Sequence, residues 1–349
     1  MVVAAGGGTI VPLSFGEIRR TTARQFFTNE WDHIILPDRS VRVWLPPEYD
    51  EQRATGYPTL YIHDGEGLMR DGPKSWGLDR TLTQLIAAGS IEAPIVVMVD
   101  STGRDGFDIG AAPVLRRRWL EYGGSPLLGD RYLSFIADEL KPTIDERFRT
   151  LPAPEFTSTM GSSMGGLCAF LSVWQRPEVF GAAACLSPVF QMPLVTDVAL
   201  NGGDRLRGTR LYIDNGGDTP ERKVTNRLPS SDVRQPTART CTSRHAAFRP
   251  IPRAPSAVTP QVPLIDLADG LDPGYWWLDT NLQPGVDAMC AALRLQGVKF
   301  DYHREPGGRH NERAWGRRSA RPLRLLLPSA VRAASSSSAS ANARVHRAR

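Results

Sequence analysis

The five apolar residues Ile95–Val99 (IVVMV) constrain the fold more than any other stretch of this chain. The run contains no polar residue and ends directly at Asp100. A strand with one side in water alternates polar and apolar residues, so an uninterrupted run predicts a strand buried on both faces. Such strands belong to parallel sheets that helices cover on both sides. We therefore expect an α/β architecture.

Strands and helices alternate along the chain, which supports this expectation. Apolar runs predict strands at Val41–Leu45 and Thr59–His63, and leucine and isoleucine at helical spacing predict a helix over 79–88. The same criteria predict helices over 130–147 (bent at Pro142), 167–174 and 282–296, and strands ending near Met160 and over 181–186, 211–213 and 299–302. The predicted fold class is a doubly wound, mostly parallel sheet with helices on both faces.

Two segments do not fit this alternation. Residues 224–261 contain six prolines and no lasting period, which indicates a disordered insertion. Joining residues 222–223 directly to Val262 gives the continuous sequence ERKVPLIDLADG, so our hypothesis is a late insertion such as a translated intron. Residues 329–349 are rich in serine and alanine and are predicted to be a disordered tail. Residues 1–328, interrupted at 224–261, are expected to form a single domain.

The basic character of the chain is concentrated in two stretches. The formal net charge is +5 and the isoelectric point is about 9.2. Residues 222–262 carry eight basic side chains and one acid, and residues 317–349 carry eight and none. The remainder has 26 basic and 36 acidic residues, so its net charge is about −10. We interpret both basic stretches as segments of low order, and we expect no nucleic-acid partner.

The sequence also bears on location. No stretch approaches the roughly 20 apolar residues of a membrane span, so no membrane partner is expected. The first 15 residues lack a basic region followed by an apolar one, which favours a cytoplasmic location. The cysteines form no CxxC pair and are interpreted as buried thiols in a reducing compartment: Cys168, Cys185, Cys241 and Cys290.

The strongest chemical motif is G-x-S-x-G at Gly161–Gly165, between a predicted strand and a predicted helix. In this context the pattern is the nucleophile elbow, a strained turn that projects a serine hydroxyl above the sheet. Ser163 is therefore the candidate nucleophile. The backbone N–H of Met164, the next residue, is a candidate donor to the oxyanion. The alternative is a glycine-rich turn with an idle serine.

A serine nucleophile needs a histidine base, which follows it in the chain order Ser, acid, His. His245 lies in the predicted insertion and His346 in the predicted tail. His303 ends the last predicted strand and is interpreted as an ordinary surface residue. His310 follows the loop that comes after that strand, so it is the candidate base.

The acid of the triad has several candidates. Asp214 continues the strand LYI, and it is also a candidate structural residue. Asp218 follows two glycines and is favoured because its loop is free to turn toward His310. Glu221 is the reserve, and Asp279, beyond the insertion, is the remote alternative.

These residues resemble a known family. The segments LYIHDGEGL, RRRWLEYGG, TMGSSMGGL, RLYIDNGGD and PGGRHNERAWGRR are similar to the putative esterase family of α/β-hydrolases, which includes enterochelin esterases, feruloyl esterases, esterase D and antigen 85 mycolyltransferases. The resemblance covers residues 41–327 without the insertion. It implies the α/β-hydrolase fold, with Ser163 as nucleophile, His310 as base, Asp218 as acid, and the amides of Glu66 and Met164 as the oxyanion hole. Many members have HDGQN where this chain has HDGEG.

The resemblance and the motifs together predict a serine esterase that acts on a small-molecule ester through an acyl-enzyme. Such a reaction needs neither metal nor cofactor. His310-Asn311-Glu312 has no second histidine at metal-ligand spacing, so no metal site is expected. One alternative is acyl transfer to an alcohol by the same triad. Another is a non-catalytic binding protein, or an inactive product of a flawed gene model.

Overall fold

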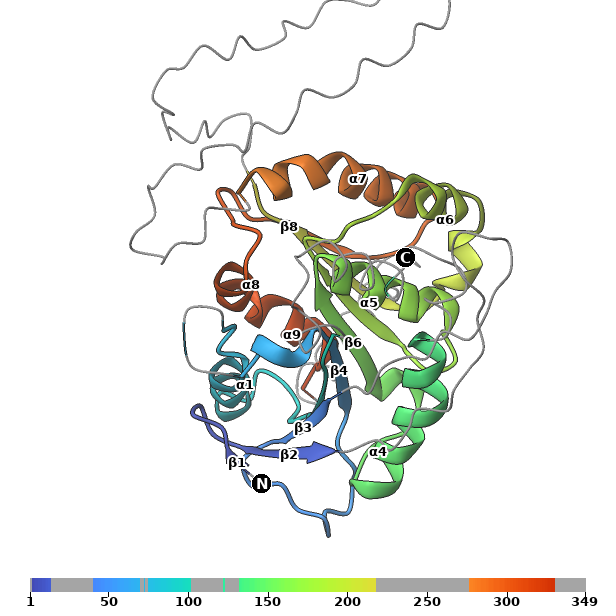
Figure 1. Ribbon diagram of the computed structural model, residues 1–349. Coiled ribbons are helices and arrows are strands. Elements are labelled where there is room, and N and C mark those ends of the chain that lie inside the picture. Colours follow the sequence, from blue (N-terminus) through green and yellow to red (C-terminus); the bar gives the residue numbers. More distant parts are fainter. Residues whose placement is uncertain are drawn as a thin grey trace, which may run out of the picture.

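The computed structural model describes residues 2–13, 40–69, 72, 75–101, 122, 132–217 and 276–329 (Figure 1). The predicted insertion at 224–261 lies outside the described residues. The predicted tail also lies outside them, apart from Ser329 at its start, which is buried. Both remain predictions.

The described residues form one nine-stranded sheet in the order β1-β2-β3-β5-β4-β6-β7-β8-β9. The strands β1, β2, β3 and β5 pair antiparallel in succession, and from β5 to β9 every neighbouring pair is parallel. The carboxyl ends of β4 to β9 therefore lie along one edge of the sheet. Their bounds are β1 Val2–Val3, β2 Thr9–Leu13, β3 Val41–Leu45, β4 Thr59–His63, β5 Ile95–Val99, β6 Thr157–Ser162, β7 Ala182–Leu186, β8 Arg210–Asn215 and β9 Asp301–Arg304.

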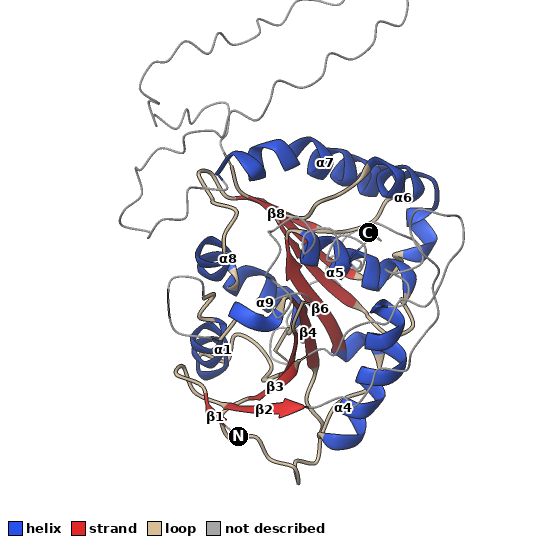
Figure 2. Cartoon of the chain, in the orientation of Figure 1, coloured by secondary structure: helices blue, strands red, loops and turns tan. Residues whose placement is uncertain are grey.

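Helices cover both faces of this sheet (Figure 2). One core contains side chains of α4 (Lys141–Arg147), α5 (Met164–Gln175), α6 (Met192–Arg205) and α7 (Trp276–Leu295). The opposite core contains side chains of α1 (Leu78–Ala87), α8 (Glu312–Arg318) and α9 (Ala320–Leu326). The doubly wound α/β prediction is confirmed. None of the helices within the described ranges has the length and apolar character needed to cross a membrane.

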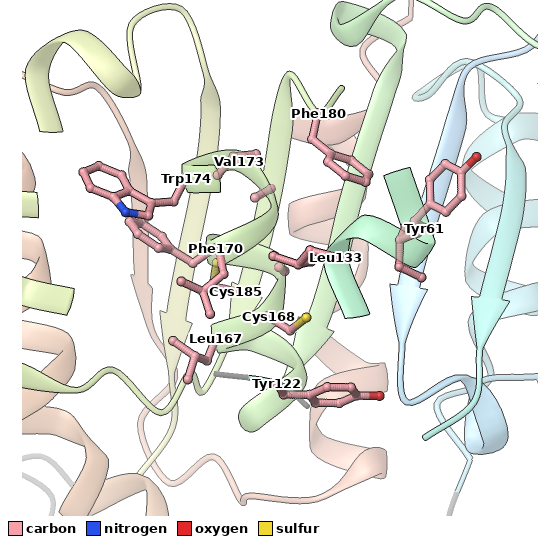
Figure 3. Close-up of a cluster of buried hydrophobic side chains, with 14 of the residues drawn as sticks. Tyr61, Tyr122, Leu133, Leu167, Cys168, Phe170, Val173, Trp174, Phe180 and Cys185 are labelled. Atoms are coloured by element: carbon pink, nitrogen blue, oxygen red, sulfur yellow. The ribbon is translucent and has the colours of Figure 1, made fainter. Parts of the chain in front are cut away.

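Strand β5 shows why its sequence is uniformly apolar. Ile95, Val97 and Val99 belong to the first core, and Val96 and Met98 to the second, and all five are fully buried. Because successive side chains point to opposite faces, a strand between two helical layers has no polar position. Figure 3 shows part of the first core, where Phe170 and Trp174 of α5 lie near Cys185 of β7. Cys168, Cys185 and Cys290 are buried free thiols, and Cys241 lies outside the described residues.

The predicted helix over 130–147 contains a distortion before its proline. The chain is helical from Tyr132, passes through a π-helical segment at Phe135–Leu140 (η4), and continues as α4 with Pro142 near its start. Proline lacks an N–H and its ring crowds the carbonyl four residues earlier, so the wider turn relieves that contact. A change in helix type thus precedes Pro142, the residue at which the sequence predicted a bend.

Several elements were not predicted from the sequence. Strand β2 lies near the sheet edge and its Pro12 interrupts the strand pattern. Helix α6 contains Gly202 and Gly203, which disfavour a helix locally, but it packs against α7. Our interpretation of the basic stretch from residue 317 was wrong in its first part: α8 and α9 are ordered helices that bury Arg318.

Core packing around α5 gives a stability prediction. We expect Phe170→Ala to lower the free energy of unfolding by about 3–5 kcal/mol, because the side chain is fully buried and its removal leaves a cavity. Leu295→Ala, at a position 74% exposed, should change it by less than about 0.5 kcal/mol. Urea unfolding of both variants measures the difference, and equal effects would contradict the described packing.

Candidate active site

Ser163 lies at a sharp turn between β6 and α5. Its backbone has φ 58° and ψ −122°, a conformation that non-glycine residues rarely adopt. The backbone N–H of Ser163 donates to the carbonyl oxygen of Leu186 at the end of β7, over 2.8 Å. The turn is therefore tied to the neighbouring strand. Ser163 is partly exposed, in contrast to its buried neighbours Ser162 and Met164.

Two glycines make this turn possible by allowing close backbone approach. A Cβ atom at Gly161 would lie 2.3 Å from the carbonyl oxygen of Gly165. A Cβ atom at Gly165 would lie 2.7 Å from Oδ2 of Asp64, in the loop after β4. The contact at Gly161 is with backbone, which cannot yield, so glycine there is a steric requirement of the turn; at Gly165 the Asp64 side chain would have to move.

His310 is held by a carboxylate far away in the sequence. Its Nδ1 lies 2.7 Å from Oδ1 of Asp279, which is in the first turn of α7. The side chain of His310 is 5% exposed and that of Asp279 is fully buried. Their contact fixes the ring and reserves Nδ1 for the acid, which leaves Nε2 for another partner.

The position of Asp279 is fixed by the end of β8. The side-chain amide of Asn215 donates to the backbone oxygen of Asp279 (2.8 Å) and to Oε1 of Gln283 (2.7 Å), both in α7. Gly216 follows, and a Cβ atom there would lie 2.2 Å from Oδ2 of Asp279. The hydrogen bonds of Asn215 and the lack of a side chain at Gly216 therefore let the start of α7 pack against the carboxyl end of β8.

The other candidates for the acid and the base have other partners in the described part of the chain, or lie outside it. Asp214 is buried in an ion pair with Arg318, so its structural role is supported. His303 is partly exposed and pairs with Glu305 at 2.8 Å between Nε2 and Oε2. Asp218, the favoured acid, lies outside the described residues. So do Glu221, His245 and His346. The structure therefore brings His310 together with the remote alternative, Asp279.

A chain of contacts connects the Ser163 turn with His310. The ring of His310 meets Trp315 edge to face, with centroids 4.9 Å apart. The indole N–H of Trp315 donates to Oγ of Ser187 over 3.1 Å. Ser187 directly follows Leu186, whose carbonyl binds the amide of Ser163. Both candidate residues are therefore attached to the carboxyl end of β7.

Beneath this contact chain lies a buried ion pair. Nε and Nη2 of Arg318 donate to the two carboxylate oxygens of Asp214 over 2.9 and 3.0 Å, in a two-point arrangement. Nη2 also donates to Oγ of Ser187 over 2.6 Å. Asp214 further accepts from the hydroxyl of Tyr212 and from the amide of Ser187. The sequence analysis did not identify Arg318. Its only signal in the sequence is its position three residues after Trp315.

The loop after β4 provides the second expected oxyanion amide. Asp64 has φ 58°, and a short 3₁₀ turn follows at Gly65–Gly67 (η1). The carboxylate of Glu66 is buried and accepts from the backbone N–H (2.9 Å) and the hydroxyl (2.5 Å) of Ser101, after β5. The side chain of Glu66 thus attaches this loop to the end of β5.

Burial raises the pKa of the Glu66 carboxyl above its ordinary value, and the negative charge of Asp64 raises it further. The hydroxyl of Ser101 and the backbone N–H of Glu66 itself act in the opposite direction, because they donate to the carboxylate. The amide expected in the oxyanion hole therefore already has an acceptor nearby. Within the described residues, no group of three or more His, Cys, Asp or Glu side chains is arranged to hold a metal ion.

The proteins that this chain is similar to include esterases. A family model described as "Putative esterase" matches residues 34–247, which is more than half of the chain. The chain is 24% identical over 151 residues to the uncharacterized protein YbbA of Bacillus subtilis. It is 30% identical over 170 residues to an endo-1,4-beta-xylanase/feruloyl esterase of Xylanibacter ruminicola. These matches cover 43% and 47% of this chain, but only 56% and 21% of the two relatives.

Solved structures share the fold at low identity. A ferulic acid esterase superimposes with a TM-score of 0.55 at 17% identity, covering 92% of this chain and 98% of the other. Ferric enterobactin esterase from Salmonella typhimurium gives 0.56 at 14% identity, covering 91% and 58%. BES protein from Bacillus cereus gives 0.55 at 12%, covering 94% and 97%. The fold is therefore the α/β-hydrolase fold that the sequence predicted.

The ion pair beneath the site gives a second stability prediction. We expect Arg318→Met to lower the free energy of unfolding by about 3–5 kcal/mol, because it leaves the buried charge of Asp214 without its partner. The double variant Asp214→Asn/Arg318→Met should recover about half of this loss, since no isolated charge remains. Urea unfolding tests both, with exposed Arg317→Met as the control. The pairing would be contradicted if the double variant lost as much unfolding free energy as Asp214→Asn and Arg318→Met lose together.

The raised pKa of Glu66 predicts a pH dependence. The folded state binds this proton more readily than the unfolded state, so the carboxyl contributes stability at low pH that is lost as pH rises through its folded pKa. Glu66→Gln removes that contribution. The stability of the variant relative to the parent should therefore increase between about pH 4.5 and pH 8.

Urea unfolding of both proteins across this pH range measures the difference. The exposed Glu155→Gln variant controls for the change in net charge. A difference between parent and Glu66→Gln that decreases with pH would contradict the assigned shift.

Proposed function

The chain belongs to the putative esterase family, and we propose that it hydrolyses carboxylic esters with Ser163, His310 and Asp279 as its catalytic triad. The observation that carries this proposal is the 2.7 Å contact between Nδ1 of His310 and Oδ1 of Asp279, both buried. The strained turn at Ser163, at the carboxyl end of β6, supplies the candidate nucleophile. Asp279 thus takes the role that the sequence had favoured for Asp218.

Each residue has a defined step. Asp279 accepts a hydrogen bond from the Nδ1–H of His310, and Nε2 takes the proton of the Ser163 hydroxyl. The serine oxygen attacks the ester carbonyl, and the alcohol leaves with the proton that His310 returns. Water then cleaves the acyl-enzyme by the same route. The charged imidazole is stabilised by the buried carboxylate of Asp279.

The tetrahedral oxyanion needs two donors. The backbone N–H of Met164 is suitable, because it lies in the first turn of α5, where amides have no partner within the helix. The N–H of Glu66 is the second proposed donor. Its own carboxylate lies close to it, so a bound oxyanion competes with that group for the proton.

The proposed substrate is a small-molecule carboxylic ester. The family, a curated relative described as a xylanase and feruloyl esterase, and solved neighbours described as ferulic acid and enterobactin esterases support this class. The proposed triad also supports acyl transfer if an alcohol replaces water in the second step. Analysis of products formed with and without added alcohol separates the two reactions.

The experiment measures release of nitrophenol from nitrophenyl acetate and butyrate. We expect Ser163→Ala and His310→Ala to lower kcat by at least about 10³-fold. Asp279→Asn should lower kcat by about 10³- to 10⁴-fold, because the imidazole loses its orienting acceptor. Asp218→Asn is the matched control for the other candidate acid and should retain activity within about twofold.

The outcomes separate the assignments. Loss of activity in Asp218→Asn with activity retained in Asp279→Asn would move the acid to Asp218 and leave the nucleophile unchanged. Full activity in Ser163→Ala, in a protein that unfolds like the parent, would overturn the serine mechanism. An unchanged thermal unfolding profile in each variant shows that a lost rate reflects chemistry and not folding.

A further inference from the structure

A cavity lies between the end of β9 and the helices α8 and α9. Its volume is about 700 Å³, within the range of small-molecule sites. Its lining includes His303, Glu305, Gly308, Arg317, Arg321 and Arg324, and we call it the arginine pocket. The proposed ester hydrolysis uses none of these side chains.

The charge of this pocket is unbalanced. Arg317, Arg321 and Arg324 are four and three residues apart, and Ser319 between the two helices has helical backbone angles, so the three side chains share one face. All three are exposed. Across the residues that the structure describes, none of the three forms an ion pair. Three like charges on one cavity repel each other unless an anion binds between them.

The other charged groups of the pocket do not supply that anion. Glu305 is the acidic residue of the lining, and its carboxylate binds the ring of His303 at 2.8 Å. Arg318, 6% exposed, also lines the pocket and uses Nε and Nη2 for Asp214. Its charge is balanced by Asp214. The three exposed arginines are therefore left without an ion-pair partner among the described residues.

We propose that the arginine pocket binds the phosphate group of a small anionic ligand. Guanidinium groups donate in a planar fork that matches phosphate oxygens, and several of them around one cavity favour a doubly charged group. The size of the pocket accommodates an organic phosphate as well as the free ion. The proposal goes beyond ester hydrolysis and does not depend on it.

The pocket also adjoins the proposed base. Glu305 and Gly308 form part of its wall, and His310 follows two residues later on the same loop. The loop is attached to the end of β8, because the amides of Glu305 and Gly307 donate to the carbonyls of Asn215 and Gly217. A bound phosphate would therefore contact the segment that carries His310.

The test is isothermal titration of the full chain with inorganic phosphate, glycerol phosphate and pyrophosphate at constant ionic strength. We expect saturable binding with pyrophosphate tightest, because it offers the most charge to the arginines. Arg317→Gln and Arg321→Gln should each weaken binding about tenfold, since each removes one charge-assisted contact. Arg313→Gln is the matched control, because Arg313 is exposed on the same helix and does not line the pocket.

Several results would overturn the proposal. One is the absence of saturable binding of all three probes below about 10 mM. Another is equal weakening by Arg313→Gln, which would indicate attraction to net positive charge only. A third is binding of a glutamate-rich peptide without binding of any phosphate probe. Tighter binding of glycerol phosphate than of inorganic phosphate would support an organic ligand, and the reverse would support the free ion. Because the readout is binding, failure here leaves the esterase proposal unaffected.

Discussion

The ion pair between Asp214 and Arg318 is the interaction on which the candidate active site depends. It joins β8 to α8 through two buried side chains, and both of them bind Ser187 at the end of β7. Ser187 in turn fixes Trp315, which packs against His310, and adjoins the carbonyl that binds the Ser163 amide. Burying two charges costs desolvation free energy, and the pair offsets this cost only while its geometry is kept. The ion pair therefore fixes the relative positions of β8 and α8, in a site whose residues come from distant segments.

The architecture was largely predictable from the sequence. The strands Val41–Leu45, Thr59–His63 and Ile95–Val99 were placed to the residue, because burial on two faces leaves a strong apolar signal. The last strand was predicted two residues early, since Asp301, Tyr302 and His303 are not a continuous apolar run. Helices α8 and α9 were missed because a sequence rich in arginine resembles a solvated segment until its partners are known.

The proposed acid, Asp279, was less predictable than the proposed nucleophile or the proposed base. Ser163 and His310 are marked by short local patterns, which are set by the steric needs of one turn or one loop. Asp279 has no such pattern, because its position depends on Asn215 and Gly216, more than 60 residues earlier. No local rule reports a contact between segments so far apart, and Asp218 satisfied the local rule better.

The backbone strain at Ser163 has a consequence for how such a chain persists. A non-glycine residue at φ 58° and ψ −122° costs on the order of 1–3 kcal/mol, and glycine there would avoid most of that cost. Glycine at position 163 would therefore give a more stable protein without the proposed nucleophile. Selection for stability alone favours that exchange, because most proteins have little stability to spare. Serine at this turn is thus retained at a cost in folding free energy, which is a common property of residues at functional sites.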